Sequence, residues 1–163
     1  MATDLFNDFL HPFDALPFSV LSLRLIAAMV LGGAIGWERE MHQKSAGFRT
    51  HLLMALAACL VTLLGFDIIA GATQQAAADG LRADPLRIIN AVTAGLGFLA
   101  AGVIIHGSGT VHGLTTGASM WLSGAIGMVC GAGRLPLAIL ATVMVLIVLW
   151  LLRKTEHLRG NGN

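Results

Sequence analysis

A charged segment of this chain reads Trp37-Glu38-Arg39-Glu40-Met41-His42-Gln43-Lys44-Ser45-Ala46-Gly47-Phe48-Arg49-Thr50-His51, and it interrupts an otherwise almost continuous apolar run from Ser19 to Arg153. In lipid, such a run can satisfy its backbone hydrogen bonds within helices. The ionic chemistry of the chain is therefore concentrated at one face of a membrane. Function is expected there and at the few polar groups inside the helices.

The composition is that of an integral membrane protein. Hydrophobic residues make up 56% of the 163 residues, charged residues only 12%, and the mean hydropathy is +0.78. A soluble domain typically carries about 25% charged residues. The net charge of +1 points to no nucleic-acid partner. Cys59 and Cys130 lie in apolar runs, where they are expected to be small packing residues rather than a disulfide.

Hydropathy predicts an all-α, polytopic membrane helix bundle with about five transmembrane helices. The spans are expected at residues 18–37, 51–71, 87–106, 114–131 and 135–152. The fourth span is diluted by polar residues, and without it the C-terminus would change sides. The expected organisation is an N-terminal lead-in at 1–17, a transmembrane domain at 18–153 and a short cytoplasmic tail at 154–163.

The basic residues predict the orientation of the bundle. With the N-terminus outside, the inner side receives Arg39, Lys44, Arg49, Arg153, Lys154 and Arg159, and the outer side receives Arg82, Arg87 and Arg134. Basic residues are in excess on the cytoplasmic side of membrane proteins. The N-terminus is therefore expected outside, and the charged segment and the C-terminus in the cytoplasm.

Glycine spacing predicts close packing between helices. The pairs Gly32/Gly36, Gly113/Gly117 and Gly127/Gly131 each have small residues four positions apart, and the third span adds Gly95, Gly97 and Gly102. Small residues let helix backbones approach closely in lipid. A tight bundle is expected, formed within one chain or between two copies.

Several apparent chemical motifs do not support an enzyme. The segment GLGFLA at residues 95–100 imitates a dinucleotide fingerprint, but it lies inside an apolar helix with no preceding strand. His106 and His112 have no cysteine or carboxylate beside them that would complete a metal site. No catalytic residue, metal ligand set or cofactor is predicted.

The polar residues inside the spans have structural and functional interpretations. Arg24 is costly in lipid unless it snorkels outward or meets a partner, for which Asp67 and Asp84 are candidates. Four more residues can hydrogen-bond between helices or, alternatively, line a polar path: Asn90, Thr93, Ser119 and Ser123.

Glu38 is expected to need a compensating partner. It lies at the end of the first helix, where a carboxylate meets the negative end of the helix dipole. Arg39 is adjacent and points elsewhere on a helix, whereas Arg49 could return to Glu38 across the loop. One hypothesis is a buried Glu38–Arg49 pair that orders this connection. The other is a solvated charged loop that only fixes the topology.

Five ordered motifs give the chain a family resemblance. They are GGAIGWERE (32–40), KSAGFRTH (44–51), DPLRII (84–89), GLGFLAAGVI (95–104) and VHGLTTGASMW (111–121). Together they resemble the signature of the MgtC/SapB family of bacterial inner-membrane proteins. The likeness extends from about Arg24 to the end of the fifth span. Ala100 stands where the family usually has glycine, and the chain resembles a short form with the transmembrane domain only.

The resemblance implies a five-span, non-enzymatic membrane domain linked to growth at low magnesium, to acid stress and to virulence-type survival. It implies three kinds of partner. These are the lipid bilayer, another membrane protein such as the ATP synthase, and a second copy with which the chain forms a dimer or other homo-oligomer. Carried over by motif position, the functional residues are Glu38, Arg39, Gly47, Arg49, Thr50, Asp84, Arg87, Asn90, Gly113, Thr115, Thr116 and Trp121.

Three functions remain open at the level of sequence. The favoured hypothesis is a regulator that docks against another membrane protein. The second is a small transporter or channel for Mg²⁺ or another cation, which requires a polar path lined by residues such as Arg24, Asn90, Thr93, Thr115 and Thr116. The third is a purely structural or lipid-interacting protein.

Overall fold

The fold is that of a computed structural model, which describes residues 16–76, 84–107 and 110–160. The elements are α2 (Phe18–Met41), α3 (Phe48–Ala76), α4 (Pro85–Gly102), β1 (Ile105–Gly107), β2 (Thr110–His112), α5 (Leu114–Gly131) and α6 (Leu135–Gly160). The all-α membrane helix bundle predicted from hydropathy is confirmed. The strands β1 and β2 form a short antiparallel hairpin that the sequence did not predict.

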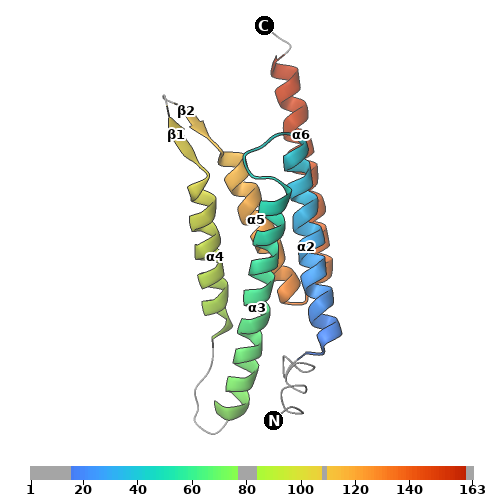
Figure 1. The fold of residues 1–163 in the computed structure, drawn as a ribbon, viewed down its shortest axis with the longest axis vertical. Helices are drawn as coiled ribbons and strands as arrows, with labels where there is room; N and C mark the ends of the chain where they lie inside the picture. Colours follow the sequence, from blue (N-terminus) through green and yellow to red (C-terminus); the bar gives the residue numbers. More distant parts are fainter. Residues whose placement is uncertain (1–15, 77–83, 108–109, 161–163) are drawn as a thin grey trace.

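The helices run up and down in a bundle (Figure 1). The connection between α2 and α3 lies at the same end as the hairpin, and we call this end of the bundle the hairpin end. The start of α2, the end of α3 and the turn between α5 and α6 lie at the opposite end. Because α6 runs back toward the hairpin end, the C-terminal part of the chain lies at that end as well.

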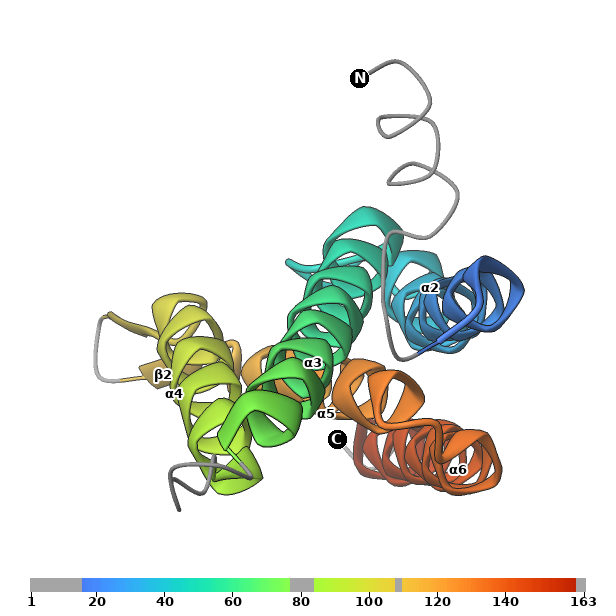
Figure 2. The ribbon, with the colours of Figure 1, turned by 90° about the horizontal axis from the view of Figure 1, so that it is seen from below.

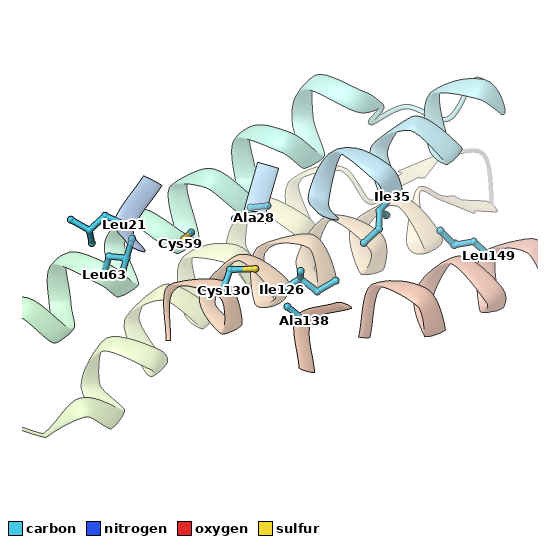
Figure 3. Packing of buried hydrophobic residues seen from close by; sticks show 10 residues of the cluster. Leu21, Ala28, Ile35, Cys59, Leu63, Ile126, Cys130, Ala138 and Leu149 are labelled. Atoms are coloured by element: carbon cyan, nitrogen blue, oxygen red, sulfur yellow. The ribbon is translucent and has the colours of Figure 1, made fainter. Parts of the chain in front are cut away.

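Helices α3 and α5 form the centre of the bundle, as the end-on view shows (Figure 2). Helix α2 packs against α3 and α5, α6 against α2 and α5, and α4 against α3 and α5 on the other side. The larger buried cluster includes Ala28 and Ile35 from α2, Cys59 from α3, and Ile126 and Cys130 from α5 (Figure 3). Both cysteines are buried and free, so the packing role predicted for them is confirmed.

The glycines of α2 and α5 permit this close packing, as predicted. A Cβ atom on Gly36 would lie 2.8 Å from Phe48 Cα, and one on Gly131 would lie 2.8 Å from the Cys59 carbonyl oxygen. Gly32 faces the Ala55 side chain and Gly127 the Ala55 backbone with similarly little room. These positions must remain glycine because α3 occupies the space a side chain would need.

The glycines of α4 were also expected to pack helices tightly, and this prediction is wrong for the chain as a single copy. Cβ atoms on Gly95, Gly97 and Gly102 would meet nothing within 4 Å. They lie on a helix that touches the bundle along one side only. The packed side of α4 is formed instead by Leu96 and Ala100, both of which are buried.

Three helices are long and apolar enough to cross a membrane: Phe18–Met41, Phe48–Gly71 and Pro85–Gly102. A shorter apolar segment, Leu135–Leu151, belongs to α6. The chain is therefore a membrane protein.

The predicted boundaries differ from the structure at several helix ends. Helix α4 ends at Gly102, whereas the third span was expected to reach residue 106, because the chain turns there into the hairpin. Helix α6 continues to Gly160 through most of the predicted tail. The expected lead-in lies mostly outside the described residues.

Candidate functional site

Buried polar side chains gather at the hairpin end, where α2, α3 and α5 meet. We call this group, together with the exposed Ser45 that bonds to it, the polar cluster; it consists of Arg39, Ser45, His51, Thr116, Ser119 and Ser123. Arg39 is 4% exposed, and His51 is fully buried. Buried polar groups are costly unless they form hydrogen bonds, so their arrangement determines what this end of the bundle can do.

Thr116 joins α2 and the first connection to α5. Arg39 Nη2 donates a hydrogen bond to Thr116 Oγ1 at 3.1 Å, and Ser45 Oγ donates to the same oxygen at 3.4 Å. Thr116 lies in the first turn of α5 and is 4% exposed. A guanidinium on α2 is thus held by a hydroxyl on α5, which is the stronger, charge-assisted kind of hydrogen bond.

His51 links α3 to α5 and to the first connection. Its Nδ1 lies 2.8 Å from the Gly47 carbonyl oxygen, and because a carbonyl only accepts, Nδ1 carries the hydrogen. Its Nε2 lies 3.1 Å from Ser119 Oγ. Ser119 Oγ also reaches the Thr116 carbonyl oxygen, and since a hydroxyl has one hydrogen it donates either to that oxygen or to Nε2, not to both. Ser123 Oγ donates to the His51 carbonyl oxygen at 2.8 Å. The imidazole is therefore fixed on both sides.

Glu40 and Gly47 fix the start of α3. Glu40 Oε2 accepts a hydrogen bond from the Phe48 backbone N–H at 2.7 Å. A carboxylate at a helix N-terminus is favourable because the helix dipole is positive there. Gly47 allows this contact, since a Cβ atom at that position would lie only 2.7 Å from Glu40 Oε2. The Gly47 singled out by the family resemblance thus has a local structural reason.

Of the two hypotheses for Glu38, the ion pair with Arg49 is not formed among the described residues. Glu38 Oε1 lies 3.3 Å from His42 Nδ1, one turn along the same helix, which is an ion pair when the imidazole is protonated. Arg49 is exposed on the outer side of α3, and no hydrogen bond or ion pair within the described ranges joins it to Glu38. The group beside Glu38 Oε1 therefore comes from its own helix, while Glu38 Oε2 is buried with no hydrogen-bond partner among the described residues.

Arg24 has a role that neither sequence hypothesis named. Its Nη1 donates to the Gly131 carbonyl oxygen at 2.8 Å, at the C-terminus of α5. Its guanidinium also lies against Gly133, which has a positive φ of 75° in the turn that follows. A cation at a helix C-terminus meets the negative end of the dipole. Arg24 therefore caps α5 instead of pairing with Asp67 or Asp84.

The remaining predicted site residues do not join the polar cluster. Asp84 accepts from the Leu86 N–H and caps α4, and Thr93 donates to the Ile89 carbonyl oxygen of its own helix. Four others are exposed in this chain: Arg87, Asn90, Thr115 and Arg49. Thr50 lies on α3 and Trp121 on α5. Gly113 immediately precedes α5, where it adopts a positive φ of 86°.

The two histidines of the hairpin do not form a pair across the strands. His106 is opposite Val111 in the strand register, and His112 is opposite Ile105. Among the described residues, no group of three or more His, Cys, Asp or Glu side chains could hold a metal ion.

Two members of the polar cluster were missed as site residues by sequence reasoning. His51 and Ser45 stand inside the quoted KSAGFRTH segment, but they were not selected from it. The available signal was a histidine at the start of an apolar span, where an ionisable group needs a partner. The serine gave no signal of its own, because its role depends on Thr116 far along the chain.

Relatives of known sequence cover most of this chain. It is 36% identical over 153 residues to an uncharacterized protein of Haemophilus influenzae, covering 88% of this chain and 63% of the relative. It is 40% identical over 156 residues to the Escherichia coli protein "Putative magnesium transporter YhiD", covering 86% of this chain and 69% of that one. It is 39% identical over 135 residues to "Protein MgtC" of Salmonella typhimurium, covering 83% and 53%.

The chain therefore spans roughly half to two thirds of the length of these relatives. No solved structure matches it significantly. The model of the MgtC family matches residues 25–158, from the first described helix to the end of the last. That stretch includes every residue of the polar cluster, and it shows that this chain belongs to the MgtC family.

Proposed function

We propose that this chain is a non-enzymatic regulator in the bacterial inner membrane, acting in adaptation to low magnesium and acid stress by docking against another membrane protein. The observation that carries the proposal is the polar cluster itself. Its side chains hydrogen-bond to one another and to backbone carbonyls, from Arg39 through Thr116 to His51. These contacts tie α2, α3 and α5 together inside the hairpin end, whereas a conduit needs polar groups turned toward a path.

The positions of the residues that a transport path would use also favour a regulator over a transporter. Arg24 is engaged at the opposite end of the bundle, with the carbonyl of Gly131. Thr93 bonds within its own helix, and Asn90 and Thr115 are exposed on different helices. Because these groups lie apart, they do not line one route through the bundle.

The family supports a connection with magnesium and with survival under stress. One relative bears the name MgtC, and another is named for magnesium transport. The resemblance further suggests the membrane ATP synthase as a candidate partner and virulence-type survival as a setting. In this proposal the hairpin end faces the cytoplasm and the N-terminus lies outside. Lys44 and Arg49 are exposed at the hairpin end, as the excess of basic residues on the cytoplasmic side requires.

A cation transporter is the second candidate, because the name of the Escherichia coli relative describes one. The test is ion flux in proteoliposomes that contain the purified chain, measured for Mg²⁺, Na⁺ and H⁺. The regulator account predicts flux no greater than in protein-free vesicles. Flux that is lost in Glu38→Ala or Asn90→Ala, with the variants still folded, would replace it with the transporter.

Regulation of the ATP synthase has its own test. ATP-driven proton pumping is measured in inverted membrane vesicles with and without the chain, and with the pair Thr116→Val and Thr115→Val. Thr116 is buried and receives the Arg39 hydrogen bond, whereas its neighbour Thr115 is exposed. The proposal predicts that proton pumping is lower in vesicles that contain the chain or its Thr115→Val variant. In vesicles that contain Thr116→Val, pumping should return to the level measured without the chain. Equal pumping in all vesicles would reject the ATP synthase as the partner.

A further inference from the structure

His51 is the member of the polar cluster whose charge can change near neutral pH. The Arg39 guanidinium stays protonated in proteins, and the serine and threonine hydroxyls carry no charge. His51 has 0% of its surface exposed and lies in the first turn of α3. A proton that binds to this imidazole therefore brings a charge into the interior of the bundle, where a charge is costly.

The hydrogen bonds around His51 accommodate both the neutral and the protonated imidazole. In the neutral form Nδ1 carries the hydrogen that the Gly47 carbonyl accepts, so Ser119 Oγ donates to Nε2 at 3.1 Å. In the protonated form Nε2 carries a hydrogen as well and donates to Ser119 Oγ. The Ser119 hydroxyl hydrogen then turns to the Thr116 carbonyl oxygen, 2.9 Å away. Rotation of one hydroxyl group is enough to exchange one set of bonds for the other.

The charges around His51 balance only while its imidazole is neutral. Two side chains of α2 act on it through space: the Arg39 guanidinium repels a positive charge there, and the Glu38 carboxylate attracts one. These two charges cancel, and α5 contributes only hydroxyl groups to the cluster. The other cations of the first connection and the start of α3, Lys44 and Arg49, are exposed. A proton on His51 would leave one positive charge without a counter-charge inside the bundle.

Glu38 has one carboxylate oxygen that the contacts described so far do not use. Its Oε1 lies 3.3 Å from His42 Nδ1, whereas Oε2 is buried without a hydrogen-bond partner among the described residues. The next carboxylate, Glu40, is held by the Phe48 N–H at the start of α3. Glu38 is therefore the group that can act as the counter-charge of a protonated His51.

We propose that His51 is a proton-binding site that opens the hairpin end in acid. When Nε2 is protonated, Glu38 becomes the counter-charge of His51, and Arg39 leaves Thr116 because the interior balances only one cation. Ser45 bonds to the same Thr116 oxygen, so the first connection separates from α5. The use of this opening as an acid signal rests on the proposed function, whereas proton binding and opening require no partner protein.

The direction of the pH effect follows from the burial of the charge. The closed form keeps the His51 imidazole out of water, and the open form lets water and lipid headgroups solvate it. Acid therefore raises the share of the open form, between about pH 8 and about pH 5, where an imidazole takes up its proton. Because one proton is bound, the ratio of open to closed molecules changes by at most about tenfold per pH unit.

Spin labels on Lys44→Cys and Thr115→Cys measure the separation of the first connection from α5. Both positions are exposed, and native Cys59 and Cys130 are fully buried, so the labels attach to the introduced thiols. The double variant is labelled at neutral pH, reconstituted in liposomes and measured by pulsed electron resonance at a series of pH values. One distance is expected at neutral pH, and a second, longer distance should grow in acid.

Replacement of single histidines assigns the effect to His51. In His51→Gln and His51→Asn, which keep a polar side chain that does not titrate, the distance should not depend on pH. The matched control is His42→Gln, because His42 is the partly exposed histidine beside Glu38, and it should keep the full response. Circular dichroism confirms that each variant is folded.

Nitrogen NMR of the native chain follows the proton itself. The His51 signal is identified by its loss in His51→Gln or by its shift in Ser119→Ala, and Nε2 should gain its hydrogen over the pH range in which the longer distance grows. A distance that does not change with pH in the native chain would overturn the proposal. So would a response that persists in folded His51→Gln, or protonation of Nε2 without a change in distance. None of these measurements involves the ATP synthase or ion flux, so they can fail while the proposed function stands.

Discussion

Arg39 on α2 donates a hydrogen bond to Thr116 Oγ1 on α5 at 3.1 Å, although 77 positions separate the two residues in the chain. The contact joins two motifs of the family resemblance, GGAIGWERE and VHGLTTGASMW, at the hairpin end of the bundle. It supplies one acceptor to a guanidinium that has only 4% of its surface exposed. A buried guanidinium is stable only with hydrogen-bond acceptors around it.

The first prediction concerns Thr116. Thr116→Val keeps the shape of the side chain but removes an acceptor from buried Arg39, and we expect a loss of about 1–2 kcal/mol in the free energy of unfolding. The matched control is Thr115→Val, because Thr115 is exposed and adjacent. Reversible unfolding in mixed detergent micelles provides the measurement. Similar losses for both variants would show that the Arg39 contact contributes nothing specific.

The second prediction concerns the glycine contacts. Gly127→Ala places a methyl group against the backbone of Ala55, so α3 and α5 must separate, at a cost of about 1–3 kcal/mol. Gly95→Ala is the control, since a Cβ atom there meets nothing within 4 Å. Thermal denaturation in detergent should show a lower midpoint for Gly127→Ala and no loss for Gly95→Ala. A lower midpoint for Gly95→Ala than for Gly127→Ala would contradict the close packing of α5 against α3 at Gly127.

The third prediction concerns Glu38. Because His42 and not Arg49 lies beside its carboxylate, the effects of Glu38→Gln and Arg49→Gln on unfolding should add, with a coupling energy below about 0.5 kcal/mol. A double-mutant cycle on the unfolding free energy measures this coupling. The same cycle for Glu38 and His42 should give a larger coupling at a pH where the imidazole is protonated. A strong Glu38–Arg49 coupling would restore the ion pair that the structure lacks.

The fourth prediction concerns Arg24. Arg24→Met removes the charged donor from the Gly131 carbonyl and should cost about 1–2 kcal/mol of unfolding free energy. Arg24→Lys keeps the positive charge at the end of α5 and should recover part of this loss. Arg134→Met, an exposed position in the neighbouring turn, is the control and should have little effect. Denaturant titration compares the three variants, and an equal loss in Arg134→Met would argue against capping by Arg24.

Most of the bundle could be predicted from sequence because hydropathy shows which segments favour lipid, although α5 is not among the three helices that are long and apolar enough to cross a membrane. The fourth predicted span, 114–131, coincides with α5. The ends were less predictable: α4 ends at Gly102 because the chain turns into a hairpin whose register depends on pairing between Ile105 and His112. Hydropathy predicts roughly how long an apolar segment is, but it does not predict the residue at which the helix ends and the β1–β2 hairpin begins.

The candidate site could be predicted only in part, because its contacts are long-range. Ser119 and Ser123 were selected as polar residues inside a span, and Arg39 and Thr116 by motif position from the family resemblance, and the structure brings the four together. Sequence spacing suggested Arg49 as the partner of Glu38, since the two are close in the chain. The chosen partner was wrong because spacing does not determine the direction in which α3 leaves the first connection.

The proposed function requires that the buried members of the polar cluster, Arg39, His51, Thr116, Ser119 and Ser123, are closed to water, and thiol accessibility tests this most directly. Ser123→Cys places a thiol at a fully buried position of the cluster, and Thr115→Cys places one at an exposed position of the same helix. Both variants are treated in proteoliposomes with a membrane-impermeant thiol reagent. The account predicts complete labelling of Thr115→Cys while Ser123→Cys, like native Cys59 and Cys130, stays unlabelled. Rapid labelling of folded Ser123→Cys would contradict it and would reveal a water-filled path through the cluster.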